Sequence, residues 1–136
     1  MSHWEKVESQ VTNLDTLQAA CEELGATVRR NAVARGYSRA KANTTYGKDK
    51  NADMVISIGE GQYDIAVTLD PETGVYGMEA ESAAYHLKKA FQKGGHRFGK
   101  ILEMYSVHQA EDICRKKRKS FDRVVHKDRI DVEVYV

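Results

Sequence analysis

Residues 53–80, DMVISIGEGQYDIAVTLDPETGVYGMEA, hold three short apolar segments separated by turn sequences. The middle segment, residues 63–69, alternates apolar with polar or small side chains, which is the period of a β-strand. GEGQ joins the first segment to the second, and DPETG joins the second to the third. In DPETG, Pro71 presets its own φ angle and Gly74 can adopt a positive φ. This stretch therefore predicts antiparallel strands connected by tight turns.

The flanking sequence adds helices and further strands. Strands are predicted over 2–11 and 26–34, with a helix at 12–25 that Thr12 or Asn13 can cap and Gly25 can end in the left-handed conformation. The remaining pattern predicts helices over 82–93 and 97–119 and a terminal hairpin over 121–136. This layout predicts one α+β domain, residues 1–136, with a single curved, mainly antiparallel sheet and helices packed on one face.

Composition narrows the class of protein. The chain has 136 residues, 41% hydrophobic and 30% charged, which suits one compact domain. No apolar run is long enough to span a bilayer and no signal-peptide layout is present, so we expect a soluble, cytoplasmic protein without membrane contact. Cys21 and Cys114 fall in predicted helices, which favours reduced core thiols over a disulfide. Neither a phosphate-loop motif nor HExxH occurs, so we predict no cofactor and no metal site.

Charge is strongly banded along the chain, although the net charge is only +1. Residues 26–51 carry a net +6, residues 52–87 a net −7, and residues 88–119 a net +7. Such banding indicates a dipolar surface, which either binds an anionic partner or associates head to tail with a second copy. Together with short edge strands, it favours a homo-oligomer.

The first basic band lies in RRNAVARGYSRAKANTTYGKDKNAD, residues 29–53. Arginine can grip phosphate oxygens in a bidentate fork, and tyrosine can stack on a base. The alternative is a solvated connection between strands. If the region binds a ligand, we predict contacts from six residues, the last on the neighbouring strand: Arg35, Tyr37, Arg39, Lys41, Tyr46 and Tyr63. A second run, RKKRK at 115–119, matches a nucleic-acid patch, but cations at a helix C-terminus also complement the helix dipole.

A polar cluster is predicted where the first strand meets the long helix. His3 falls on the inward row of that strand, and Tyr105 and His108 lie one turn apart on the helix. A buried polar cluster is costly unless its hydrogen bonds are satisfied, so the three residues form either a structural cluster or a site. We favour the structural role. His108 and Asp112 have the spacing to bridge a metal, but only with further ligands.

Catalysis has weak support in the sequence. Asp64, Glu79 and Glu81 are the central carboxylates, and the simplest interpretation is a solvated strand face. The favoured function is a small non-catalytic protein that binds an anionic ligand, either a nucleotide-like small molecule or nucleic-acid phosphates. A protein–protein adaptor is the alternative, and an enzyme is disfavoured.

Several segments resemble a known family. MSHW, LQAACEELG, RGY, QYDIAV and MYSVHQA, followed by a valine-rich hairpin, resemble in this order the hypothetical chloroplast open reading frame thirty-five family of cyanobacteria, plastids, other bacteria and phages. That family has no established biochemical role, so the resemblance implies mainly the fold. The chain departs from the family at 76–95, where the family's tryptophans are missing, and in SRAKANTTYGKDKN, which is unusually basic. These departures favour a phage-encoded member, for which sequestering a host nucleotide signal would suit basic pockets without a catalytic set.

Overall fold

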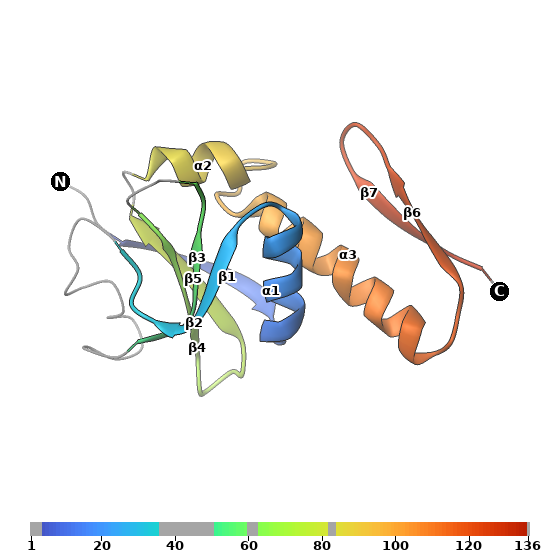
Figure 1. The fold of residues 1–136 in the computed structure, drawn as a ribbon, viewed down its shortest axis with the longest axis horizontal. Coiled ribbons are helices and arrows are strands. Elements are labelled where there is room, and N and C mark those ends of the chain that lie inside the picture. The colour runs from blue at the N-terminus through green and yellow to red at the C-terminus, as the bar shows by residue number, and fades with distance from the viewer. Residues whose placement is uncertain (1–3, 36–50, 60–62, 82–83, 136) are drawn as a thin grey trace.

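The computed structural model describes residues 4–35, 51–59, 63–81 and 84–135. It confirms the predicted α+β class (Figure 1). The elements in chain order are β1 (Trp4–Val11), α1 (Leu14–Glu23), β2 (Thr27–Ala32), β3 (Ala52–Ser57), β4 (Ile65–Leu69), β5 (Tyr76–Glu81), α2 (Tyr85–Phe91), α3 (Gly99–Lys116), β6 (Phe121–Val125) and β7 (Ile130–Val134). The last two helices are shorter than the predicted ranges 82–93 and 97–119.

The main sheet has five strands in the order β1-β5-β4-β3-β2, and every neighbouring pair is antiparallel. Strands β2 to β5 lie side by side in chain order, and the predicted DPETG turn joins β4 to β5, with the Gly74 amide donating to the Asp70 carbonyl at 2.8 Å. β1 instead lies beside β5, so α1 carries the chain from one edge of the sheet to the other. In the register of the central strands, Ala66 lies opposite both Val55 and Glu79.

One face of this sheet carries all three helices, as predicted. Met54, Ile65 and Met78 come from three adjacent strands and share a single core with α1, α2 and α3. Each of these three side chains is fully buried, and burial of such side chains contributes roughly 1.5–3 kcal/mol apiece. The largest contributions from the helices to this core are Leu17, Leu87, Phe91 and Ile101, joined by Phe98 just before α3.

The ends of α1 follow the sequence signals. The side chain of Asn13 accepts a hydrogen bond from the Thr16 amide (3.1 Å), which caps the first turn. At the other end Gly25 has φ +89°, and the Ala26 amide donates to the Cys21 carbonyl at 3.0 Å. This is the Schellman arrangement that glycine favours.

The predicted terminal hairpin forms a second, two-stranded sheet, β6–β7. It packs on α3, which lies between the hairpin and the main sheet (Figure 1), and its contact residues include Ile130 and Val132. An isolated two-stranded hairpin is marginally stable in water, so contacts with the helices must hold it.

Both cysteines are buried free thiols, as predicted. Burial, with a smaller contribution from Glu22, raises the pKa of Cys21 to about 12, so this thiol is unreactive at neutral pH. Within the described ranges, no helix has the length and apolar character needed to cross a membrane.

Candidate functional site

Asp64 is the centre of a compact polar cluster. Its side chain is fully buried, and its two carboxylate oxygens accept hydrogen bonds from three residues. Arg35 donates from Nε at 3.0 Å, from Nη2 at 2.9 Å and from its backbone amide at 2.8 Å. Ser57 donates from Oγ at 2.7 Å, and Arg29 from Nη2 at 3.3 Å. We call these four residues the Asp64 cluster.

The sheet topology brings the cluster together. Arg29 is on β2, Ser57 ends β3, and Asp64 immediately precedes β4, so the pairing of three adjacent strands brings these side chains together. The Asp64 amide also donates to the Arg35 carbonyl at 2.9 Å. Arg35 and Asp64 are therefore joined through both backbone and side chain.

The charges of the cluster are fixed by these contacts. Burial raises the pKa of Asp64, but hydrogen bonds from Arg35 and Ser57 outweigh it and hold the pKa below its ordinary value. The side-chain hydrogen bonds from Arg35 to Asp64 in turn raise the pKa of Arg35. With one carboxylate and two guanidinium groups, the cluster carries a net positive charge at neutral pH.

Both arginines remain accessible. The side chains of Arg29 and Arg35 are 47% and 45% exposed, whereas the Asp64 side chain is 0% exposed. A guanidinium has five N–H donors, and Arg35 uses two of them on Asp64. The buried carboxylate thus anchors two arginines whose remaining donors can reach a ligand.

The structure describes two of the six predicted ligand contacts, and their side chains have different surroundings. Arg35 joins the Asp64 cluster, whereas the Tyr63 ring packs on the main core and stacks on His86 of α2, with ring centroids 6.1 Å apart. His86 Nε2 lies 3.1 Å from the Tyr63 carbonyl oxygen. The other four predicted contacts lie outside the described residues: Tyr37, Arg39, Lys41 and Tyr46.

The interpretation of the central carboxylates as a solvated strand face is wrong. Asp64, Glu79 and Glu81 are 0%, 4% and 0% exposed. The cations that allow burial of Asp64 belong to the preceding basic band, so counting charges within one band could not reveal the pairing.

The residues of the predicted polar cluster have different roles. Tyr105 is 3% exposed, and its hydroxyl oxygen accepts hydrogen bonds from the amides of Thr12 (3.2 Å) and Asn13 (3.3 Å). Tyr105 therefore satisfies backbone donors at the start of α1, which is a structural role. His108 instead contacts Glu23, with Nε2 and Oε1 2.6 Å apart. His3 lies outside the described residues.

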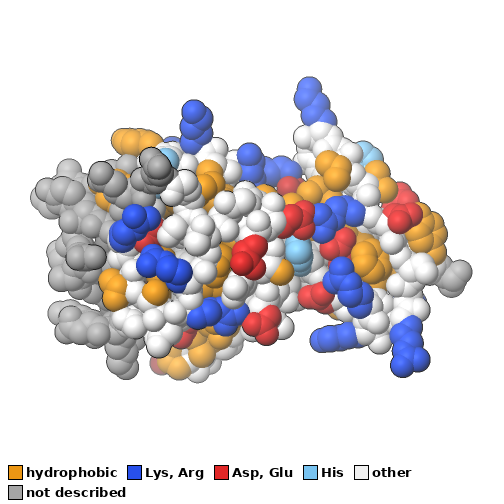
Figure 2. Space-filling view, viewed as in Figure 1, with side chains coloured by type: hydrophobic (Ala, Val, Ile, Leu, Met, Phe, Trp, Pro, Cys, Tyr) orange, Lys and Arg blue, Asp and Glu red, His pale blue; other side chains and the backbone are white. Residues whose placement is uncertain are grey.

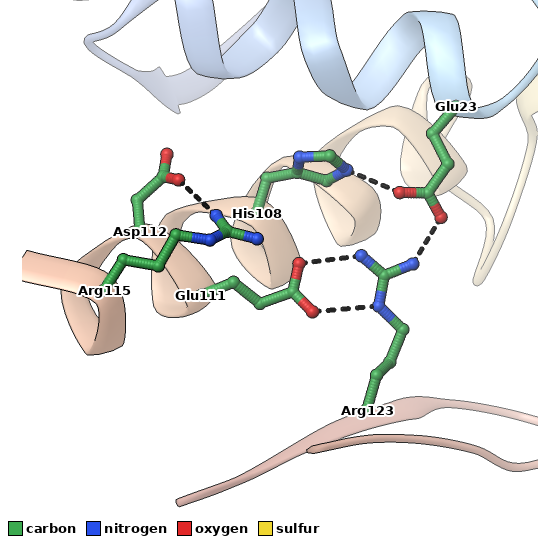
Figure 3. Close-up of polar contacts among 6 residues, drawn as sticks. All are labelled: Glu23, His108, Glu111, Asp112, Arg115 and Arg123. Atoms are coloured by element: carbon green, nitrogen blue, oxygen red, sulfur yellow. Dashed lines mark hydrogen bonds and ion pairs between the residues drawn. The ribbon is translucent and has the colours of Figure 1, made fainter. Parts of the chain in front are cut away.

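His108 belongs to a second group that joins three elements (Figure 3). Arg123 of β6 donates to Glu111 of α3 from Nε (3.1 Å) and from Nη2 (2.7 Å), and also contacts Glu23 of α1. We call Glu23, His108, Glu111 and Arg123 the Arg123 network. The sequence pattern missed it, because Arg123 and Glu23 are 100 residues apart and neither lies in a motif.

Nothing in the described ranges is arranged as a metal site with three or more histidine, cysteine or acidic ligands. Of the i, i+4 pair His108 and Asp112, His108 contacts Glu23. Asp112 instead accepts from Arg115 Nη1 at 2.8 Å (Figure 3) and from Thr16 Oγ1 at 3.3 Å.

No protein-family model, curated protein or solved structure matches this chain significantly. The chemistry of the site therefore rests on its geometry.

Proposed function

We propose that this protein is a small, non-catalytic binding protein for an anionic, nucleotide-like ligand, with Arg29 and Arg35 as anchoring residues. The observation that carries the proposal is the convergence of two half-exposed arginines on one buried carboxylate. Arginines held in this way lose little side-chain entropy when they bind phosphate oxygens. Each charge-assisted hydrogen bond to phosphate contributes about 1.5–3 kcal/mol.

The state of Asp64 supports a binding role over a catalytic one. A general base that works near neutral pH needs a pKa raised towards that range. The pKa of Asp64 is lowered, and both of its oxygens accept hydrogen bonds in the cluster. Asp64 therefore acts as an anchor for the arginines.

We also propose membership of the hypothetical chloroplast open reading frame thirty-five family. Its two most specific internal segments, RGY and YDI, lie far apart in sequence. Arg35 of the first and Asp64 of the second bond to each other through backbone and side chain, which supports treating the two segments as one unit.

Native mass spectrometry of the purified protein, followed by titration with pyrophosphate, ATP and a cyclic dinucleotide, tests the binding proposal. Arg29→Ala should weaken binding at least tenfold. Arg35→Lys should also weaken binding, because lysine keeps a cation beside Asp64 but lacks the arginine fork. Arg30→Ala is the matched control, since Arg30 contacts Asp15 and Gln18 of α1 instead.

Two results would overturn the proposal. One is that none of the three probes binds the wild-type protein. The other is that Arg30→Ala weakens binding as much as Arg29→Ala, which would indicate non-specific charge attraction. A stoichiometric protein that copurifies with wild type, and is retained by Arg29→Ala, would instead favour the adaptor function.

A further inference from the structure

The C-terminal end of α3 carries a second concentration of positive charge, remote from the Asp64 cluster. Residues 115–119 are five consecutive exposed basic residues, RKKRK. Arg115 pairs with Asp112, but no described residue makes an ion pair with the side chains of Lys116, Lys117, Arg118 or Lys119. Basic side chains gather at this end of α3 in Figure 2, away from the main sheet.

The backbone at Arg118 adds an independent observation. Arg118 has φ +53°, the left-handed conformation. The Lys119 amide donates to the Cys114 carbonyl at 2.9 Å, and the Arg118 amide to the Arg115 carbonyl at 3.1 Å. Helix α3 therefore ends in the same Schellman motif as α1, with arginine in the position that Gly25 occupies in α1.

The presence of arginine at a position that glycine usually occupies needs an explanation. A β-carbon in the left-handed conformation is strained, and glycine avoids that strain. Favourable interaction with the helix dipole explains cations in the last turn of α3, where Arg115 and Lys116 lie. It does not explain Arg118, which lies beyond the end of the helix at Lys116. Strained non-glycine residues cluster at functional positions, and here the strained residue contributes one more exposed cation.

The backbone of an aromatic residue, Tyr135, is hydrogen-bonded next to the end of the basic run. The Tyr135 amide donates to the carbonyl of Ser120, the residue that follows Lys119, at 2.9 Å. The Tyr135 hydroxyl donates to Asp122 at 2.7 Å, which fixes the ring, and Tyr135 remains 50% exposed. Cations combined with a fixed, accessible aromatic ring are what single-stranded nucleic acids need, because the cations contact phosphates and the ring stacks on a base.

We propose that Lys116 to Lys119, together with Tyr135, form a binding surface for single-stranded nucleic acid. Duplex nucleic acid fits less well, since its bases are stacked and present no open face to Tyr135. The site does not depend on the Asp64 cluster, because strands β2, β3 and β4 lie away from the C-terminal end of α3 and from the hairpin (Figure 1).

Fluorescence anisotropy with a labelled 12-nucleotide oligothymidylate tests this surface. Four neutralised phosphates give a slope of about −3 for log affinity against log salt. Raising salt from about 50 to 200 mM should therefore weaken binding about 50-fold. Arg29→Ala should leave this binding unchanged, which separates it from the proposed function.

Arg118→Gly is the most informative variant, because it should change two properties in opposite directions. Relief of backbone strain should raise the melting temperature by about 3 °C, while loss of one phosphate contact should weaken binding several-fold and reduce the salt slope by about 0.7. A residue with only a structural role would not show a gain in stability with a loss of binding.

Two matched comparisons complete the test. Lys116→Gln with Lys117→Gln should weaken binding about tenfold or more, whereas Lys88→Gln with Lys89→Gln, at the end of α2, should not. Tyr135→Phe should keep most of the affinity, because its ring still stacks, and Tyr135→Leu should lose it.

Three outcomes would overturn the proposal. The first is no anisotropy change with wild type at low salt. The second is unchanged affinity in Arg118→Gly, or an equal loss in the α2 lysine pair. The third is equal or tighter binding of a 12-base-pair duplex or of phosphatidylserine vesicles, which would assign the surface to a different partner.

Discussion

Replacing Arg123 by alanine should release the C-terminal hairpin from the helices. Arg123 is the residue of β6 that bonds to both Glu111 of α3 and Glu23 of α1 (Figure 3). The apolar contacts of Ile130 and Val132 remain after the change. We therefore expect the hairpin to open more often while the five-stranded sheet stays folded.

The magnitude follows from the burial of Glu111. Its side chain is only 6% exposed, and both hydrogen bonds to its carboxylate come from Arg123. Removing one partner of a buried pair costs about 3–5 kcal/mol. Arg123 is 26% exposed, so the lower end of that range applies. The bond to Glu23, which is 35% exposed, adds at most about 1 kcal/mol. We expect a loss of about 3 kcal/mol.

Amide hydrogen exchange is the direct assay. In Arg123→Ala, the β6 and β7 amides should exchange about 100-fold faster, since 1.4 kcal/mol corresponds to a factor of ten. Amides of β3 and β4, which open through global unfolding, should be accelerated no more than those of β6 and β7. Urea denaturation gives the change in the global free energy of unfolding.

A double variant tests the reasoning behind this magnitude. If the loss arises from the unpaired carboxylate, then Arg123→Ala combined with Glu111→Leu should recover most of the stability, because an apolar side chain needs no partner. Hairpin exchange that is unchanged in Arg123→Ala would refute the role of the network. Equal destabilisation of the single and double variants would refute the burial argument.

Three further changes test other contacts. Asp64→Asn should lower the free energy of unfolding by about 2 kcal/mol at pH 7, by urea denaturation. Because the folded pKa of Asp64 is lower than its ordinary 3.8, the wild-type advantage holds above that pH and should vanish as the pH falls below it. Tyr105→Phe should cost about 1 kcal/mol, because two amides lose their acceptor, while Tyr85→Phe, at a 74% exposed position, should cost nothing measurable. Gly99→Ala should lower the melting temperature, because its new β-carbon would overlap the Lys93 carbonyl oxygen; an unchanged melting temperature would contradict this packing.

Local sequence patterns predicted most of the fold. Alternation over 63–69 and the turn at Pro71 and Gly74 correctly predicted β4, β5 and their connection. Gly25 was correctly predicted to end α1 in the left-handed conformation. These predictions succeeded because strand period, turn chemistry and helix capping depend on residues a few positions apart.

The contacts of the candidate site could be predicted only in part. The sequence singled out Arg35 as a ligand contact, but not its bond to Asp64, which lies 29 residues away. The Asp64 cluster exists because β2, β3 and β4 are neighbours, and no local pattern specifies which side chains then meet. For the same reason, the sequence did not predict the pairing of Glu111 with Arg123, because Glu111 by itself is an ordinary charged residue on a helix.

The Arg123 network also has a consequence for the rates of folding and unfolding. The hairpin turn is local, but Arg123 reaches Glu23 only across 100 residues of chain. Both α1 and α3 must be in place before that contact can form, so hairpin docking should follow the main barrier to folding. Substitutions at Arg123 should then accelerate unfolding and leave the folding rate nearly unchanged. Arg123 would thus prolong the docked state of the hairpin beyond what the apolar contacts of Ile130 and Val132 provide.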